Sequence, residues 1–308
     1  MNFRSPKFKI ALAFAVVYIV WGSTYIAIRF AIETIPPFLM AGMRFLTAGS
    51  ILYLFASLKD KVKPSLRHWK SAFIIGALLL LGGNGLVVWA EKIVPTGITA
   101  LIVATVPLWT VLLEWLWLKR GMPRPLVFCG IVLGVLGLWI LIKPQTNSAP
   151  LNLTGIAVLL AAAFSWAVGS IQARRAHLPK SGFMATGMEM ISGGSLLLIV
   201  GSVKGEWNHF SFKAVSAHSG FALGYLILFG ALIGFSAYKY MLKHTSPTLS
   251  STYAYVNPLI AVFLGWLLAG ELLTLRIFFG AIIIAAAVCL ITIAQKPSPH
   301  ESLDAEIS

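Results

Sequence analysis

Residues 10–29 read IALAFAVVYIVWGSTYIAIR, and residues 155–174 read GIAVLLAAAFSWAVGSIQAR. Each stretch is apolar and about 20 residues long, which is enough to cross the hydrocarbon core of a bilayer as a helix. A shift of 145 residues places Trp21 on Trp166. An apolar stretch that recurs with its tryptophan in register indicates that the chain is built from two related halves.

The composition excludes an ordinary soluble protein. Of the 308 residues, 58% are hydrophobic and only 11% are charged, and the mean hydropathy is +0.86. Soluble domains carry about 25% charged residues. The net charge of +14 falls in short loops between apolar stretches, so no polar face remains for nucleic acid. The first apolar run, from Ile10 to Ile28, is too long for a signal peptide and lacks a small-residue cleavage site, so we expect it to be retained.

Ten apolar stretches fill the chain, and prolines, glycines and charged residues separate them. We expect ten transmembrane helices, at 10–29, 37–58, 70–90, 97–118, 125–142, 153–173, 182–203, 219–240, 248–269 and 276–294. The predicted domains are an N-terminus at 1–9, a first five-span repeat at 10–142, a linker at 143–152, a second five-span repeat at 153–294 and a polar tail at 295–308.

The two predicted halves must cross the membrane in opposite directions, because each has an odd number of spans. Further residues match between them: at a shift of 145, Arg29 with Arg174, Phe38 with Phe183 and Gly42 with Gly187; at a shift of 151, Lys92 with Lys243, Pro107 with Pro258 and Trp115 with Trp266. The sequence therefore predicts an all-α membrane protein whose ten transmembrane helices form two inverted five-helix repeats around a central cavity. Inverted repeats of this kind build secondary transporters.

The basic residues predict the orientation of the chain. Most of the 24 Lys and Arg residues fall in alternate loops on the side that also carries the N-terminus. Since cytoplasmic loops are enriched in Lys and Arg, we expect both termini to be cytoplasmic and the linker at 143–152 to be external.

Three ionisable residues lie well inside predicted spans, where a charge costs roughly 2.5–3.5 kcal/mol on insertion scales. They are Arg44, Glu114 and Glu189, and Arg44 and Glu189 are repeat mates. We expect Arg44 to pair with Glu91 at the outer end of the third span, and Glu189 with Lys243 at the inner end of the eighth, as gating or coupling ion pairs. The alternative is that they form structural pairs or reach loop carbonyls.

Aromatic and polar side chains gather at mid-membrane depth. Trp21, Trp109 and Trp166 lie near mid-span, where an indole N–H needs a partner or a cavity; simple helix packing is the alternative. Hydroxyl and amide groups lie in the same spans. We expect the substrate-binding residues to be Tyr18, Trp21, Ser23, Thr24, Asn84, Trp109, Trp166, Ser170, Gln172, Tyr253, Tyr255 and Asn257.

Two mid-span prolines are repeat mates. Pro107 and Pro258 free the carbonyls of Val103 and Ala254, because proline has no N–H to bond them. Kinked backbone at membrane depth is tolerated where it lines a polar cavity. We therefore assign both prolines to gating, with helix packing alone as the alternative.

Other features limit the function. Gly130, Gly134 and Gly137 give the fifth span a small-residue face, so we expect this span and the tenth to form a scaffold or a homodimer contact. Cys129 and Cys289 lie alone in apolar runs, and we expect no disulfide and no metal site. Because no phosphate loop, His-rich spacing or acidic cluster appears, we expect no cofactor and no enzymatic activity.

Several segments resemble, in order and spacing, the EamA-like branch of the drug/metabolite transporter superfamily. The resemblance covers about residues 10–294 and rests on 21–25 WGSTY, 36–38 PPF, Arg44-Phe45, 83–85 GNG, Ala90-Glu91, 104–107 ATVP, 188–190 MEM and 253–258 YAYVNP. It implies a ten-span inverted-repeat fold with a central cavity, and export of amino acids or other small metabolites by alternating access. The Gly-Glu pair that often precedes the last span in such families matches Gly270-Glu271.

We therefore expect a secondary transporter in the bacterial inner membrane that exports small metabolites, such as amino acids or drug-like compounds. Its expected partners are a small-molecule substrate and the lipid bilayer, with protons as a candidate coupling ion through Glu189 or Glu91. A channel or facilitator without ion coupling is the alternative, although bulky mid-span tryptophans argue against a continuous polar path.

Overall fold

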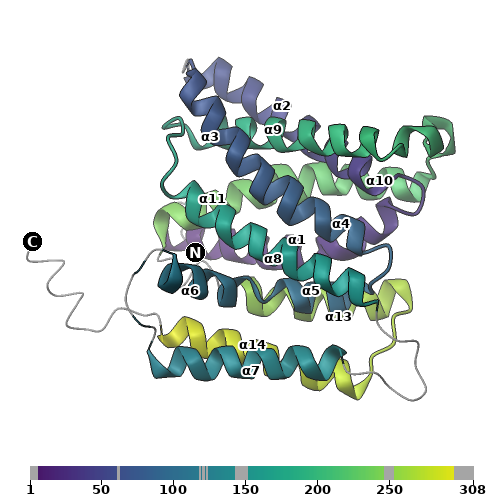
Figure 1. Ribbon diagram of the computed structural model, residues 1–308. Coiled ribbons are helices and arrows are strands. Elements are labelled where there is room, and N and C mark those ends of the chain that lie inside the picture. Colours follow the sequence, from purple (N-terminus) through teal and green to yellow (C-terminus); the bar gives the residue numbers. More distant parts are fainter. Residues whose placement is uncertain are drawn as a thin grey trace, which may run out of the picture.

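The computed structural model describes residues 6–60, 63–117, 119, 122, 124–142, 152–245 and 253–294. The described residues form helices and no strand (Figure 1). The predicted linker, apart from Asn152, and the polar tail at 295–308 lie outside them, as do residues 1–5.

The first half contains α1 (Pro6–Ala31), α2 (Pro37–Asp60), α3 (Leu66–Gly76), η1 (Ala77–Gly85), α4 (Leu86–Ala90), α5 (Thr96–Val103), α6 (Val106–Leu116) and α7 (Pro125–Ile142). The second half contains α8 (Leu153–Ala173), α9 (Gly182–Val203), the short η2 (Glu206–His209) and η3 (Phe212–Ala214), α10 (Ala217–Tyr225), η4 (Leu226–Ile233), α11 (Gly234–His244), α13 (Tyr253–Ala269) and α14 (Leu275–Ala294).

In the described part of the chain, seven helices are long and apolar enough to cross a membrane. They are Phe8–Ala31, Pro37–Asp60, Leu66–Ala90, Thr96–Leu116, Leu153–Ala173, Gly182–Val203 and Ala217–Met241, and they coincide with seven of the expected spans. The other three expected spans correspond to the shorter apolar helices Pro125–Gly137, Val256–Ala269 and Leu275–Ile291. Hydropathy therefore located all ten apolar segments, seven of which have full membrane-crossing length.

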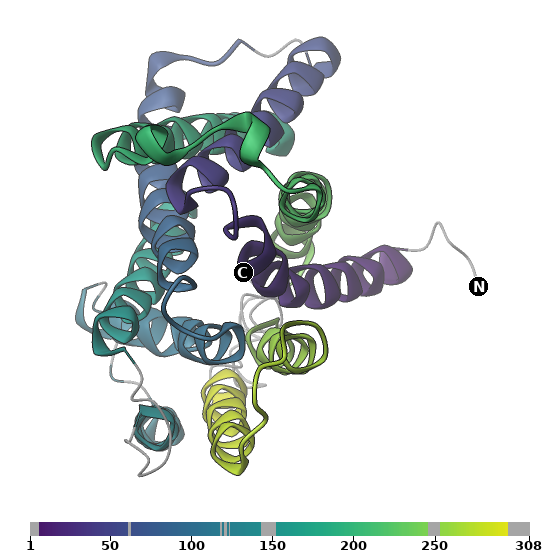
Figure 2. The same ribbon diagram turned by 90° about the vertical axis from the view of Figure 1, so that its right-hand side faces the viewer.

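The long helices lie side by side, with α7 and α14 paired at one edge and α2, α3 and α9 at the opposite edge (Figures 1 and 2). Glycines let α2 and α9 approach closely. A Cβ on Gly49 would stand 2.9 Å from the carbonyl oxygen of Gly187, and one on Gly194 would stand 3.2 Å from that of Gly42. A shift of 145 residues takes Gly49 to Gly194 and Gly42 to Gly187, so each contact is the repeat counterpart of the other. Contacts across a twofold axis are related in this way.

The glycine face predicted for the fifth span packs inside the chain. A Cβ on Gly130 would stand 2.6 Å from the Ile291 side chain, and one on Gly137 would stand 2.8 Å from that of Ile284. Both partners lie on α14, so the small-residue face of the fifth span packs against the tenth span within the chain.

Three membrane helices are irregular. The spans Leu66–Ala90 and Ala217–Met241 each contain a π-helical stretch, η1 and η4, and such stretches are frequent at functional sites. The span Thr96–Leu116 breaks into α5 and α6 at Ala104 and Thr105. The break lies just before Pro107, which cannot donate to the preceding turn. These irregular segments lie next to the cavity described below.

Candidate functional site

A cavity lies between helices of both halves and holds about 790 Å³ of space not filled by protein atoms, including its opening to solvent. Eight residues singled out from the sequence line it, namely Trp21, Thr24, Arg44, Asn84, Trp166, Tyr253, Asn257 and Pro258. Ten further residues line it that we did not assign to the binding or gating sites from the sequence, namely Tyr25, Ile28, Gly83, Val87, Ala100, Val103, Ala104, Val106, Ala162 and Phe235. An apolar, aromatic wall with a few polar groups is typical of small-molecule sites.

The two repeat-mate tryptophans meet inside the bundle. The Trp21 and Trp166 rings lie edge to face with centroids 6.2 Å apart, and Trp21 also contacts Phe235 at 5.3 Å, Tyr253 at 5.4 Å and Tyr238 at 4.9 Å. The five rings form one cluster, here called the aromatic cluster. Four of the five rings line the cavity, and Tyr238 is the member that does not.

Glycines in the two spans that contain π-helical stretches make room for these indoles. A Cβ on Gly234 would stand 2.6 Å from Trp21 Nε1, and one on Gly83 would stand 2.8 Å from Trp166 Cε3. Gly83 and Gly234 are 151 residues apart and are therefore repeat mates. Each tryptophan thus contacts a glycine of the other half, and the two contacts correspond to each other. Trp21 Nε1 also donates to the Gly230 carbonyl at 3.3 Å, so π-helical η4 supplies the partner that this buried indole needs.

Arg44 reaches the cavity from α2 and is only 2% exposed. Its guanidinium lies 4.7 Å from the centre of the Phe45 ring, a cation–π distance. Among the described residues, neither Nε nor Nη1 has a hydrogen-bond partner. The predicted pairing with Glu91 is therefore not formed as a hydrogen-bonded contact in this structure.

Glu91 lies one residue beyond the span Leu66–Ala90 and is completely buried. Both of its carboxyl oxygens lack a hydrogen-bond partner among the described residues. Burial raises the pKa of Glu91, and the nearby Glu271 raises it further, whereas Arg29 and Arg44 lower it. A buried carboxyl with these neighbours can take up a proton more readily than an exposed one.

Asn257 connects α13 to α1 at the cavity wall. In the amide orientation that satisfies its hydrogen bonds, its side-chain nitrogen donates to the backbone carbonyls of Tyr18 at 3.1 Å and Tyr253 at 3.2 Å. The side-chain nitrogen is therefore held by backbone. Tyr18 itself stands outside the cavity wall and contributes to the site through its carbonyl.

The other predicted binding residues whose side chains the structure describes do not line the cavity. Ser23 bonds Tyr225 (hydroxyl oxygens 2.6 Å apart) and the Val20 carbonyl, while Trp109 packs edge to face on Phe164 at 5.4 Å. Ser170 and Gln172 are half-buried on α8 away from it. The side chain of Tyr255 lies outside the described residues. Of the predicted gating residues, Glu91, Glu189 and Pro107 also lie outside the wall.

Glu189 pairs with a residue one turn from the predicted one. Lys239 Nζ lies 3.2 Å from Glu189 Oε2, and the Glu189 side chain is 4% exposed. We expected Lys243, whose side chain lies outside the described residues. Glu114 forms an ion pair between the two halves, with its Oε1 3.9 Å from Arg174 Nη1.

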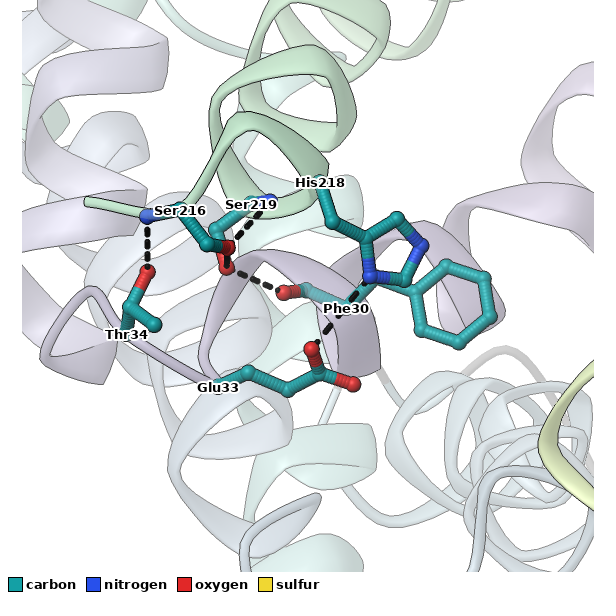
Figure 3. Close-up of polar contacts among 6 residues, drawn as sticks. All are labelled: Phe30, Glu33, Thr34, Ser216, His218 and Ser219. Carbon is teal, nitrogen blue, oxygen red and sulfur yellow. Dashed lines mark hydrogen bonds and ion pairs between the residues drawn. The ribbon is translucent and has the colours of Figure 1, made fainter.

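The end of α1 is tied to the start of α10 by a group of polar contacts (Figure 3). Ser216 N donates to Thr34 Oγ1 at 3.2 Å, and Ser219 Oγ donates to the Phe30 carbonyl at 2.8 Å. His218 Nδ1 lies 3.3 Å from Glu33 Oε2. These contacts join the two halves at the C-terminal end of α1.

Known proteins match this chain along its length. The EamA-like transporter family model matches residues 8–143 and again 153–293. The uncharacterized inner membrane transporter YedA of Escherichia coli K12 is 40% identical over all of this chain and 98% of its own length. The uncharacterized transporter YoaV of Bacillus subtilis is 26% identical over 92% of this chain and 97% of its own.

The chain belongs to the EamA-like transporter family. It is a membrane transporter of the drug/metabolite transporter superfamily with several transmembrane helices. The double match of the family model coincides with the two halves predicted from the sequence. A solved crystal structure shares the fold over 94% of this chain and 98% of its own, with a TM-score of 0.65 and 19% identity.

The Gly-Glu pair that the EamA-like resemblance points to has a definite structural role here. Gly270 has a left-handed φ of 65°, and Glu271 accepts hydrogen bonds from Thr96 N at 2.6 Å and Gly97 N at 3.1 Å. Its carboxylate thus caps the N-terminus of α5, where the helix dipole favours negative charge. Lys119, 151 residues earlier, also has a positive φ of 52°, so the backbone bend is kept where the Gly-Glu sequence is lost.

A second Gly-Glu pair was missed in the sequence. Gly205 has a φ of 73°, and Glu206 accepts from the backbone N–H groups of Phe38 at 3.3 Å and Leu39 at 2.9 Å, which caps α2. Both glutamates belong to the second half and cap helices of the first half. A glycine that permits a left-handed bend, followed directly by Glu, was the signal that could have revealed both caps.

Proposed function

We propose that this protein is a secondary carrier of the bacterial inner membrane that exports small metabolites by alternating access. Ten helices in two inverted repeats would enclose the substrate between them. The observation that carries the proposal is the aromatic cluster, to which both halves contribute and four of whose five rings line the cavity. Membrane transport follows from the family, and the inner-membrane location is that named for YedA.

Three pairs of features support an inverted repeat. The two glycine contacts between α2 and α9 are repeat counterparts of each other. The contact of Trp21 with Gly234 is likewise the counterpart of the contact of Trp166 with Gly83. The π-helical η1 and η4 occupy corresponding spans. A pseudo-twofold axis in the membrane plane would relate all three pairs, and such an axis is the basis of alternating access in many carriers.

The aromatic cluster is the proposed inner gate. Along α1, the cavity residues run from Trp21 to Ile28, which is the half of the helix nearer its outer end by the positive-inside rule. Tyr238 and Phe235 lie on α11, on the way from the cavity to the side we expect to be cytoplasmic. Separation of these rings would open the cavity inward, while the polar contacts of Figure 3 hold the outer ends of α1 and α10 together.

Two carboxyl groups remain candidates for proton coupling, and their contacts support different roles for them. Glu189 already has a cationic partner in Lys239, which suits a gate pair that breaks and reforms. Glu91 is buried without a hydrogen-bond partner among the described residues, which suits a group that binds and releases a proton. We therefore propose Glu91 as the coupling residue. A homodimer contact through α7 and α14 would have to use their exposed faces, because their glycine contact is internal.

Counterflow in proteoliposomes tests the carrier proposal. The cargo is first sought by comparing metabolites released from cells that overexpress the protein with those released from control cells. Labelled cargo should then enter vesicles preloaded with unlabelled cargo faster than empty vesicles, because a carrier exchanges one molecule for another. Flux that rises linearly with concentration and shows no counterflow would establish the channel alternative. With Glu91→Gln, counterflow should persist, whereas pH-gradient-driven accumulation should disappear.

A further inference from the structure

The end of α2 and the starts of α3 and α9 lie together at one corner of the bundle (Figure 1). Below the surface of this corner, Ala56 of α2, Ala72 of α3 and Met184 of α9 belong to one buried hydrophobic cluster. At the surface, Ser181, which is the N-cap of α9, donates to the carboxylate of Asp60 at the end of α2. These contacts fix the three helix ends relative to one another.

Positive charge is concentrated at this corner. Residues 53–74 contain five Lys and Arg residues and one acid, Asp60, whose carboxylate accepts from Ser181. Five exposed cations lie here and are called the basic corner, namely Lys59, Lys63, Arg67, Lys70 and Lys180. The opposite end of α9 differs, because residues 203–209 contain one cation, Lys204, and one acid, Glu206. The charge therefore marks one end of this edge of the bundle and not the other.

The cations share helix faces with exposed apolar side chains. On α3, Arg67, Lys70 and Phe73 are spaced three residues apart, which places them on one face, and all three are exposed. At 1.5 Å per residue, Phe73 lies about 4.5 Å further into the membrane than Lys70. On α2, Lys59 Nζ lies 5.5 Å from the centre of the exposed Phe55 ring, which is one turn deeper. A phospholipid has the same order, with a charged head group above acyl chains.

The chemistry of the basic corner suits a phosphate group. Lys and Arg form charge-assisted hydrogen bonds to phosphate oxygens, and basic groups next to membrane helices attract anionic lipids. The helices α3 and α9 both begin here, and the dipole of a helix favours negative charge at its N-terminus. By the positive-inside rule, this end of the bundle lies in the cytoplasmic leaflet.

We propose that the basic corner binds an anionic phospholipid, with its phosphate at Lys59, Arg67 and Lys70 and its acyl chains along Phe55 and Phe73. This inference goes beyond the proposed transport function, because it holds whatever the cavity carries. The competing explanation is that these cations only orient the chain in the membrane. In that case the protein binds anionic and zwitterionic lipids equally well, and the experiments below separate the two.

The first experiment measures lipid binding to the wild-type protein. The protein in detergent micelles is titrated with phosphatidylglycerol or with phosphatidylcholine of the same acyl chains, and the lipid-bound fraction is measured by native mass spectrometry. Phosphatidylglycerol should bind about tenfold more tightly or better, since each Lys or Arg near an anionic lipid contributes about fivefold. The preference should shrink in high salt, because salt screens exposed charges. Equal binding of the two lipids would overturn the proposal.

The second experiment locates the preference with variants. The triple variant Lys59→Gln/Arg67→Gln/Lys70→Gln should lose the preference for phosphatidylglycerol. The matched control removes the same net charge at the opposite ends of the helices, through glutamine substitutions of three exposed lysines, Lys92, Lys204 and Lys213, and should keep the preference. The thermal midpoint in neutral detergent shows whether each variant folds; if the triple variant does not, Arg67→Gln alone should weaken phosphatidylglycerol binding by about fivefold. A folded triple variant with the full preference would contradict the proposal.

Two further measurements separate a lipid at this corner from other anion effects. Lys9→Gln/Lys119→Gln removes two exposed cations from the same end of the bundle, on α1 and after α6, and should leave the preference unchanged. A loss as large as that of the triple variant would show a diffuse attraction and reject the basic corner. Glycerol phosphate has the phosphate without acyl chains and should not displace bound phosphatidylglycerol. Displacement at millimolar concentration would show a soluble-phosphate site and reject the lipid.

Discussion

The contact between Gly234 and Trp21 gives a direct prediction, because the space for the indole exists only while position 234 has no side chain. In Gly234→Ala, the new Cβ would stand 2.6 Å from Trp21 Nε1 and 2.9 Å from its Cδ1. Real Cβ atoms essentially never approach other atoms this closely. The indole cannot move far, because it contacts Trp166, Phe235, Tyr238 and Tyr253.

The expected loss of stability follows from three effects. Overpacking of a well-packed site costs about 1–3 kcal/mol. Displacement of the indole also weakens its 3.3 Å hydrogen bond to Gly230, which is worth about 1 kcal/mol. Replacement of glycine by alanine in a helix gains about 1 kcal/mol. The net loss for Gly234→Ala is therefore about 1–3 kcal/mol.

Gly224→Ala is the matched control, since Gly224 lies in α10 on the same span and has nothing within 4 Å of an added Cβ. The gain in helix propensity is common to both variants, so their difference isolates the clash, at about 2–4 kcal/mol. The free energy of unfolding would be measured by denaturation with SDS in mixed micelles. If Gly234→Ala proves as stable as Gly224→Ala, the described packing of Trp21 against η4 and α11 is wrong.

Three further predictions concern other contacts. Glu271→Gln should destabilise the protein by about 1 kcal/mol, seen as a lower thermal midpoint in detergent, because a neutral amide caps α5 less well than a carboxylate. Lys239→Met should cost up to about 3 kcal/mol because it leaves Glu189 buried without its cation, and Glu189→Gln in the same protein should recover most of that loss; equal losses in the single and double variants would contradict the pairing. Tyr225→Phe should cost about 1 kcal/mol, because it removes the hydroxyl that bonds Ser23, and it should cost little in a protein that already carries Ser23→Ala, since the shared hydrogen bond is then already lost.

Hydropathy and residue matching predicted the positions of the helices because both signals are local in sequence. The apolar stretches located the membrane segments, and Trp21 and Trp166 stood out because tryptophan is unusual at mid-span. Ser23 was wrongly placed in the cavity for a physical reason. A hydroxyl in a membrane helix often bonds a carbonyl of the preceding turn, as Ser23 does with Val20, and sequence alone does not show which hydroxyls do so.

Other parts of the site depend on helix rotation and approach, which sequence does not report. Phe235 and Tyr25 line the cavity although nothing distinguishes them from other aromatic residues of their spans. Lys239 and Lys243 lie one turn apart on the same helix, and the packing of α11 against α9 places Lys239 beside Glu189. Such choices require the depth and rotation of two helices at once.

The exchange of indoles and glycines between the halves bears on how the cavity could open. Trp21 of the first half lies against Gly234 of the second, and Trp166 of the second lies against Gly83 of the first. Each contact therefore crosses between the proposed repeats, and a rocking of one repeat against the other would change both at once. The two contacts are equivalent by sequence but not by environment, since Trp21 carries most of the ring contacts. In an inward-open state reached by such rocking, we therefore expect Trp21 to lose its ring contacts with Phe235 and Tyr238, which lie on the opposite repeat.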